Sequence, residues 1–133
     1  MRFLLVFFTL SFIFLLSGCN STERAPNSKE YKKLLEADPS NCFYNEQLAI
    51  TLTMEEKYEK AIQQYEKTLE ICPENPHVIF QMGISHLFLN QHEKGFSKME
   101  HAIAIVEESG DKQYADSMKN EMKAWKDNLH KIK

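Results

Sequence analysis

Apolar and polar residues divide the chain into an apolar leader, a short polar stretch and a long mixed region. Residues 3–16 carry no charge, and only Thr9 and Ser11 interrupt their apolar run. A helix over these fourteen residues would rise about 21 Å, which is shorter than the ~30 Å hydrocarbon core of a bilayer. Such a length is typical of the apolar region of a signal peptide. Residues 20–28 are polar and predict a flexible tether.

The mixed region favours helices over strands. After residue 19 the chain contains only three glycines, and its four prolines lie where loops are expected, which leaves little room for the turns of a sheet. The last segment places its large apolar residues at spacings of 4, 4, 3, 4 and 3, which is one stripe of a helix. These residues are Tyr114, Met118, Met122, Trp125, Leu129 and Ile132.

The mixed region also repeats with a period of 34 residues. The stretch "YKKLLEADPSN" (31–41) aligns with "YEKTLEICPEN" (65–75), with six identities. In the next period "YNEQLAITL" (44–52) aligns with "VIFQMGISH" (78–86), mainly by residue size. Small residues at 49, 61, 83 and 95 would let paired helices approach closely, and larger residues would fill the layer between them.

This pattern resembles the tetratricopeptide repeat, a helix-turn-helix unit of 34 residues. The resemblance implies an all-α fold, a short α-solenoid of antiparallel helix pairs with a C-terminal capping helix. It divides the domain 29–133 into a half-repeat at 28–41, repeats at 42–75 and 76–109, and a capping helix at 111–131. The six helices expected cover residues 28–38, 42–54, 57–71, 76–89, 92–108 and 111–131.

Two positions depart from the family pattern. Asn45 stands where the pattern has a large residue, so we expect the edge of the first repeat to be loosely filled. Glu107 stands where proline is usual, so we expect the preceding helix to continue until Gly110 provides a stop.

The sequence Leu16-Ser17-Gly18-Cys19 resembles the lipobox of bacterial lipoproteins. The resemblance implies that residues 1–18 are a signal peptide that is removed, that Cys19 carries a covalent lipid, and that 19–28 tether the domain to a membrane. Secretion without a lipid, or an uncleaved membrane span, are the alternatives. Because Asn20 rather than aspartate follows the cysteine, a Gram-negative source would imply the outer membrane, on the side facing the periplasm.

Charge and motifs exclude several other functions. Loss of residues 1–18 would change the formal net charge from −3 to about −4, and the interspersed signs argue against nucleic acid as a partner. "HEKGF" at 92–96 has Phe96 where the zinc-protease motif has its second histidine. No phosphate loop or nucleophile motif is present. We therefore expect no enzyme activity, no metal, no small-molecule substrate and no cofactor other than the lipid on Cys19.

If Cys19 carries a lipid, Cys42 and Cys72 remain as a pair in a compartment that permits disulfides. Cys42 would begin the first helix of a repeat and Cys72 would close the second, and antiparallel packing brings those ends together. A disulfide between them is one alternative, and two free thiols are the other.

Tetratricopeptide arrays bind protein segments on the concave face formed by the first helix of each repeat, and the resemblance carries those groove positions over to this chain. They are Phe43, Glu46, Ile50, Thr53 and Met54 in the first repeat and His77, Phe80, Ile84, Leu87 and Phe88 in the second. Such a groove would be largely apolar and suited to a helix or a hydrophobic segment. The alternative is that some of these residues pack against the half-repeat or the C-terminal helix.

Together these observations predict a membrane-anchored adaptor or assembly factor of the bacterial cell envelope, comparable to a pilotin, whose partner is a protein. The alternative is an immunity-type or inhibitory lipoprotein that neutralises a specific toxin or hydrolase. That alternative would bind through charged surface, with an affinity that salt weakens.

Overall fold

The computed structural model describes residues 24–131, which form six α-helices and no strand. They are α1 (Ser28–Ala37), α2 (Cys42–Met54), α3 (Tyr58–Ile71), α4 (Pro76–Phe88), α5 (His92–Ser109) and α6 (Lys112–Lys131). Each agrees with a predicted helix to within one residue at either end. The predicted signal peptide, Cys19 and most of the tether lie outside the described residues.

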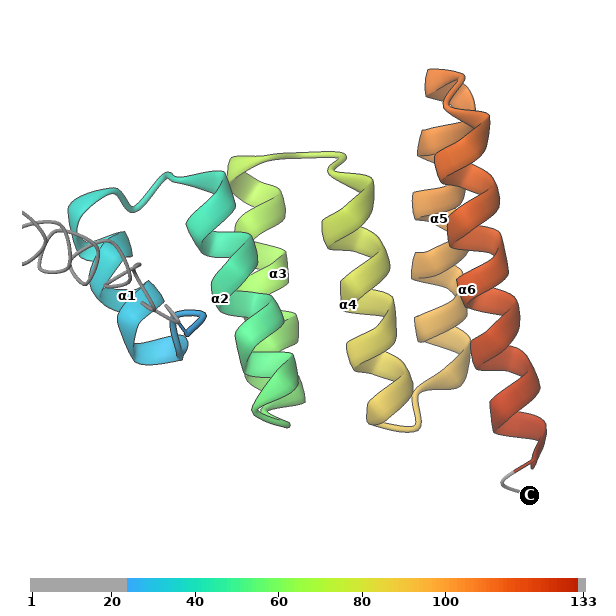
Figure 1. Cartoon of the computed structure of the whole chain (residues 1–133), viewed down its shortest axis with the longest axis horizontal. Coiled ribbons are helices and arrows are strands. Elements are labelled where there is room, and N and C mark those ends of the chain that lie inside the picture. Colours follow the sequence, from blue (N-terminus) through green and yellow to red (C-terminus); the bar gives the residue numbers. More distant parts are fainter. Residues whose placement is uncertain (1–23, 132–133) are drawn as a thin grey trace, which may run out of the picture.

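The helices follow one another in antiparallel succession and stack into a solenoid (Figure 1). α2 pairs with α3, and α4 pairs with α5, while α3 and α4 join the two pairs. α1 packs on α2 at one end of the stack and α6 packs on α5 at the other. The chain is therefore an all-α solenoid of the tetratricopeptide type, and the predicted fold class is confirmed.

Matching residues begin the equivalent helices of the two repeats. The Asn41 side chain accepts a hydrogen bond from the backbone N–H of Tyr44 at 3.0 Å, and the Asn75 side chain accepts one from that of His77 at 3.1 Å. Each asparagine thereby satisfies a backbone donor that the first turn of a helix leaves unpaired. At the other end of the second repeat, Gly110 ends α5 with φ of 84°, a conformation that favours glycine. The expected continuation of this helix to Gly110 is confirmed.

The core consists of two apolar clusters in series, and α4 contributes to both. Val78 and Met82 face the cluster formed with α1, α2 and α3. Ile79 and Phe80 face the cluster formed with α5 and α6. A helix with apolar residues on more than one side can pack against more than one neighbour. The composition of α4 therefore agrees with its central place in the stack.

Asn45 corrects the expectation of a loosely filled edge in the first repeat. The residue is 0% exposed, and its Nδ2 donates hydrogen bonds to the carbonyl oxygens of Pro39 and Asn41, both at 2.9 Å. Its Oδ1 accepts a hydrogen bond from Nε2 of Gln64 at 2.8 Å. Both the amide nitrogen and the amide oxygen of this side chain are hydrogen-bonded. The side chain therefore links the loop before α2 to α3, in the place where the family pattern has a large residue.

A half-buried hydroxyl, that of Thr53, links α2 to the buried residues Tyr65 of α3 and Ser85 of α4. Oγ1 of Thr53 lies 3.0 Å from Oγ of Ser85 and 3.4 Å from the hydroxyl of Tyr65. Burial raises the pKa of Tyr65 to about 12, although the hydrogen bond with Thr53 acts in the opposite direction. Thr53, which the resemblance placed in the groove, therefore hydrogen-bonds residues of both repeats and helps to hold the two repeats together.

Candidate functional site

The first helices of successive pairs lie along one side of the solenoid. In Figure 1, α2 and α6 lie in front of α3 and α5, with α4 between them. Contacts described below join α2 to α4 and α4 to α6 on this side. We call it the α2–α4–α6 face, and it contains the groove positions that the sequence predicts.

Three of the predicted groove residues are exposed apolar side chains. Phe43 is 59% exposed and Met54 is 79% exposed, and both belong to α2. Phe88, the last residue of α4, is 44% exposed. Ile50 is half-buried and lies between Phe43 and Met54 on the same stripe of α2, because spacings of seven and four residues return to one side of a helix.

Three other predicted groove residues are buried. Phe80, Ile84 and Leu87 are no more than 7% exposed and pack in the cluster that α4 forms with α5 and α6. They belong to the core, which corrects the expectation that they line an open groove. The physical reason is that α5 packs against this side of α4, and Ala115 and Met118 of α6 join the same apolar cluster.

The two polar groove residues are brought together across the helices. A carboxylate oxygen of Glu46 on α2 is hydrogen-bonded to Nδ1 of His77 on α4 as an ion pair. This hydrogen bond raises the pKa of His77, and the negative charges of Glu46 and Glu121 raise it further, while partial burial opposes them. Since Glu121 lies on α6, carboxylates of α2 and α6 both act on the pKa of His77 on α4.

The field of the same carboxylates extends across the face to α6. Burial is the main cause that raises the pKa of Tyr114, at the start of α6, and the charges of Glu46 and Glu121 add to it. The charge of Glu46 on α2 therefore reaches Tyr114 on α6, two helices away along the face. Glu46, near the start of α2, and Glu121, in the middle of α6, thus both add negative charge to the α2–α4–α6 face.

Aromatic rings occupy the opposite end of the face. The ring of Tyr58 stacks on Phe88 with centroids 4.7 Å apart, and Trp125 meets Phe88 edge-on at 5.4 Å. Sequence reasoning assigned Trp125 to the capping stripe and Tyr58 to no site. The sequence feature that could have identified them is Phe88, because an aromatic residue at the end of an apolar helix packs against side chains from the neighbouring helix ends.

Cys42 and Cys72 form a disulfide with their Cα atoms 6.2 Å apart. The bond joins the first residue of α2 to the residue that follows α3, so it closes the first repeat. Their Cα separation lies within the usual range for a disulfide. The bond adjoins Phe43 at the start of the face.

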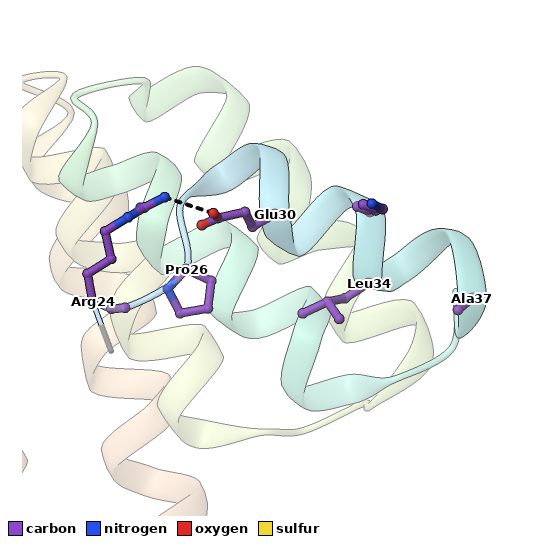
Figure 2. Close-up of a pocket in the computed structure, with 7 residues that line it drawn as sticks. Arg24, Pro26, Glu30, Leu34 and Ala37 are labelled. Atoms are coloured by element: carbon purple, nitrogen blue, oxygen red, sulfur yellow. Dashed lines mark hydrogen bonds and ion pairs between the residues drawn. The ribbon is translucent and has the colours of Figure 1, made fainter. Parts of the chain in front are cut away.

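A shallow hollow on α1 lies apart from this face. Leu34 is 39% exposed there, on a stripe of α1 that differs from the Tyr31 stripe packed toward α2. Arg24 and Glu30 form an ion pair at 2.8 Å at its rim (Figure 2). Its lining residues are Arg24, Ala25, Pro26, Glu30, Lys33, Leu34 and Ala37. The hollow is the outer side of α1, which no other helix of residues 24–131 covers.

Residues 24–131 contain no group of three or more histidine, cysteine or acidic side chains placed to hold a metal ion. Nδ1 of His86 is instead hydrogen-bonded to Oε1 of Gln91 at 2.7 Å. Among the helices of the same residues, none is long and apolar enough to cross a membrane.

No protein-family model and no curated protein matches the chain. Solved structures do match it, and one is PcrH in complex with the chaperone binding region of PopD. That alignment covers 77% of this chain and 77% of PcrH, with a TM-score of 0.66 and 19% identity. At this identity the likeness shows the fold alone, and it agrees with the tetratricopeptide-type solenoid.

Proposed function

We propose that this protein is an adaptor that is anchored to a bacterial membrane by a lipid and holds a partner protein on its α2–α4–α6 face. The observation that carries the proposal is the exposure of Phe43 and Met54, 59% and 79%, on the stripe of α2 that also holds Ile50. An apolar stripe that a folded chain leaves in water, beside the exposed ring of Phe88, is the kind of surface that a protein partner covers.

The likeness to PcrH supports this proposal at the level of the fold. The PcrH structure contains a segment of PopD, so a solenoid of this architecture can hold part of another protein. Fold analogy does not identify the partner of this chain, and the residues of the face must supply the specificity.

The anchor and its compartment are supported by the sequence and by one bond. The lipobox-like residues 16–19 precede the described domain, and the polar stretch after them is long enough to separate the domain from lipid headgroups. The disulfide between Cys42 and Cys72 favours an oxidising compartment on the outward side of the cytoplasmic membrane. We place the protein in the cell envelope, as an assembly factor comparable to a pilotin.

The test is capture of the full-length protein, with its partners, from detergent-solubilised membranes. The double variant F43D/M54D adds two charges to the face at residues that are already exposed, so its helix content by circular dichroism should equal that of the wild type. The matched control Q63D/S97D adds the same charges to exposed positions of α3 and α5. We expect one protein to accompany the wild type and the control and to be lost from F43D/M54D. Retention by F43D/M54D would exclude this face as the binding surface.

The same capture distinguishes the adaptor from an immunity-type or inhibitory protein. Contact through apolar side chains should survive added salt, whereas an inhibitor that binds through charged surface should lose its target as ionic strength rises. For the anchor, a Cys19→Ser variant should leave the membrane fraction and lose metabolically incorporated lipid. If the variant remains in that fraction, Cys19 does not anchor the protein.

A further inference from the structure

The α2–α4–α6 face differs chemically between its two ends. Alternate helices of the stack run in the same direction, so the first turns of α2 and α4 share one end of the face and their last residues share the other. Glu46 and His77 lie near the first end, whereas Met54 and Phe88 are the last residues of their helices. The first end therefore combines this charged pair with the exposed ring of Phe43, whereas the other end is apolar.

The charged end has an excess of negative charge. Four glutamates elsewhere in residues 24–131 form ion pairs with arginine or lysine: Glu30, Glu55, Glu100 and Glu107. Among the ion pairs of the same residues, none brings lysine or arginine to Glu46 or Glu121. Glu46 is paired with His77, which supplies at most one positive charge, while Glu121 adds a second carboxylate one turn before Trp125 on α6. A second cation would balance the two carboxylates.

The apolar end offers large side chains to a partner. Met54 is the most exposed large apolar side chain among the described residues, and Phe88 presents part of a ring whose other contacts are Tyr58 and Trp125. Methionine and aromatic side chains adapt to varied apolar groups and suit a contact surface. The eight residues from Glu46 to Met54 rise about 12 Å along α2, which sets the distance between the two ends.

We propose that the face takes a basic amphipathic segment of the partner protein, with lysine or arginine at Glu46 and Glu121 and a large apolar side chain at Met54 and Phe88. The inference rests on the proposed adaptor function and specifies its partner. The ~12 Å between Glu46 and Met54 equals about two turns of a helix, so a cation beside Glu46 and an apolar anchor at Met54 lie seven or eight residues apart in a helical segment. An acidic segment is repelled by the same two carboxylates.

The test uses Trp125, the one tryptophan of the chain, as a fluorescent reporter beside Phe88. The probes are two synthetic helical peptides with the same leucine anchors, one bearing lysines two turns away and the other bearing glutamates there. We expect the lysine peptide to change the Trp125 emission and to bind at least about tenfold more tightly than the glutamate peptide.

Charge variants decide whether Glu46 and Glu121 cause this preference. E46Q/E121Q should lower the affinity for the lysine peptide about tenfold. E121Q alone should give part of the loss while it leaves the hydrogen bond between Glu46 and His77 in place. The control E66Q/E70Q removes the same charge from exposed positions of α3 and should leave the affinity unchanged.

The outcomes separate this inference from the proposed function. If E66Q/E70Q weakens binding as much as E46Q/E121Q, the attraction comes from net charge and the inference is overturned. It is also overturned if neither peptide binds. If both peptides bind equally and F43D/M54D abolishes both, the face binds proteins as proposed but its preference for a basic segment is wrong.

Discussion

Gly83 of α4 and Gly95 of α5 leave no room for a side chain on each other. A carbon added at Gly83 would lie 2.7 Å from the carbonyl oxygen of Gly95, and one added at Gly95 would lie 2.9 Å from that of Gly83. Both obstacles are backbone atoms, so they cannot turn aside as a side chain could. The small residues at these positions predicted a close approach of the paired helices, and the structure shows that contact.

We therefore predict that G83A and G95A each destabilise the protein, although alanine is the better helix former. The expected loss is ~1–3 kcal/mol, the usual cost of forcing extra volume into a packed interior. Urea unfolding followed by circular dichroism measures it. Ser97→Ala, at an exposed position of α5, is the control and should change the free energy of unfolding by less than about 0.5 kcal/mol. A gain in stability for either glycine variant would show that α4 and α5 can move apart at little cost.

Asn45→Ala should destabilise the protein by ~2–3 kcal/mol. The substitution removes the side-chain donor to the carbonyl of Pro39 and the acceptor for the amide of Gln64, while the carbonyl of Asn41 keeps the backbone N–H of residue 45. The control is Gln63→Ala on the exposed side of α3, which should have little effect on the urea midpoint. An Asn45→Leu variant as stable as the wild type would mean that volume, and not hydrogen bonding, is what this position requires.

Reduction of the disulfide between Cys42 and Cys72 should lower the urea midpoint. The bond spans 30 residues of sequence, and on the loop-entropy model such a closure stabilises the folded chain by ~3–4 kcal/mol. Unfolding curves with and without reductant measure the difference. The C42S/C72S variant should match the reduced protein and show no response to reductant. Coincident curves for the oxidised and reduced wild type would contradict a stabilising bond.

The pair of Glu46 and His77 predicts a pH dependence. The folded pKa of His77 is raised above 6.5, so its charged form contributes stability that is fully present below that value and is lost as pH rises through the folded pKa. The difference in free energy of unfolding between the wild type and H77Q should therefore be larger at about pH 5 than at about pH 9. A difference that stays constant with pH would mean that His77 acts by packing alone.

The repeat made the helices predictable, because a 34-residue period and the matching asparagines at 41 and 75 determine where each helix pair begins. Other features depend on contacts that the period does not encode. The partner of Asn45 lies 19 residues away and that of Glu46 lies 31 residues away, so neither pairing follows from a local pattern.

The burial of the apolar groove residues of α4 could not be predicted from the sequence, for a different reason. Phe80, Ile84 and Leu87 match groove positions of the repeat, but whether water reaches them depends on how α5 and α6 pack beside α4. The apolar stripe of α6 predicts that this helix packs against another element, but the stripe is equally compatible with several neighbours. The remaining groove residues could be placed because a single stripe of α2 carries Phe43, Glu46, Ile50 and Met54.

Among the helices of residues 24–131, α1 packs against α2 alone, whereas α4 packs against α2, α3 and α5. In a linear stack each helix is held mainly by its neighbours, so the amide hydrogens of α1 should exchange with solvent before those of α4. In the proposed lipid-anchored protein, tension on the N-terminal chain enters the domain at α1. α1 can then separate from α2 and lengthen the connection to the membrane, while α2, α4 and α6 keep the face that a partner would occupy.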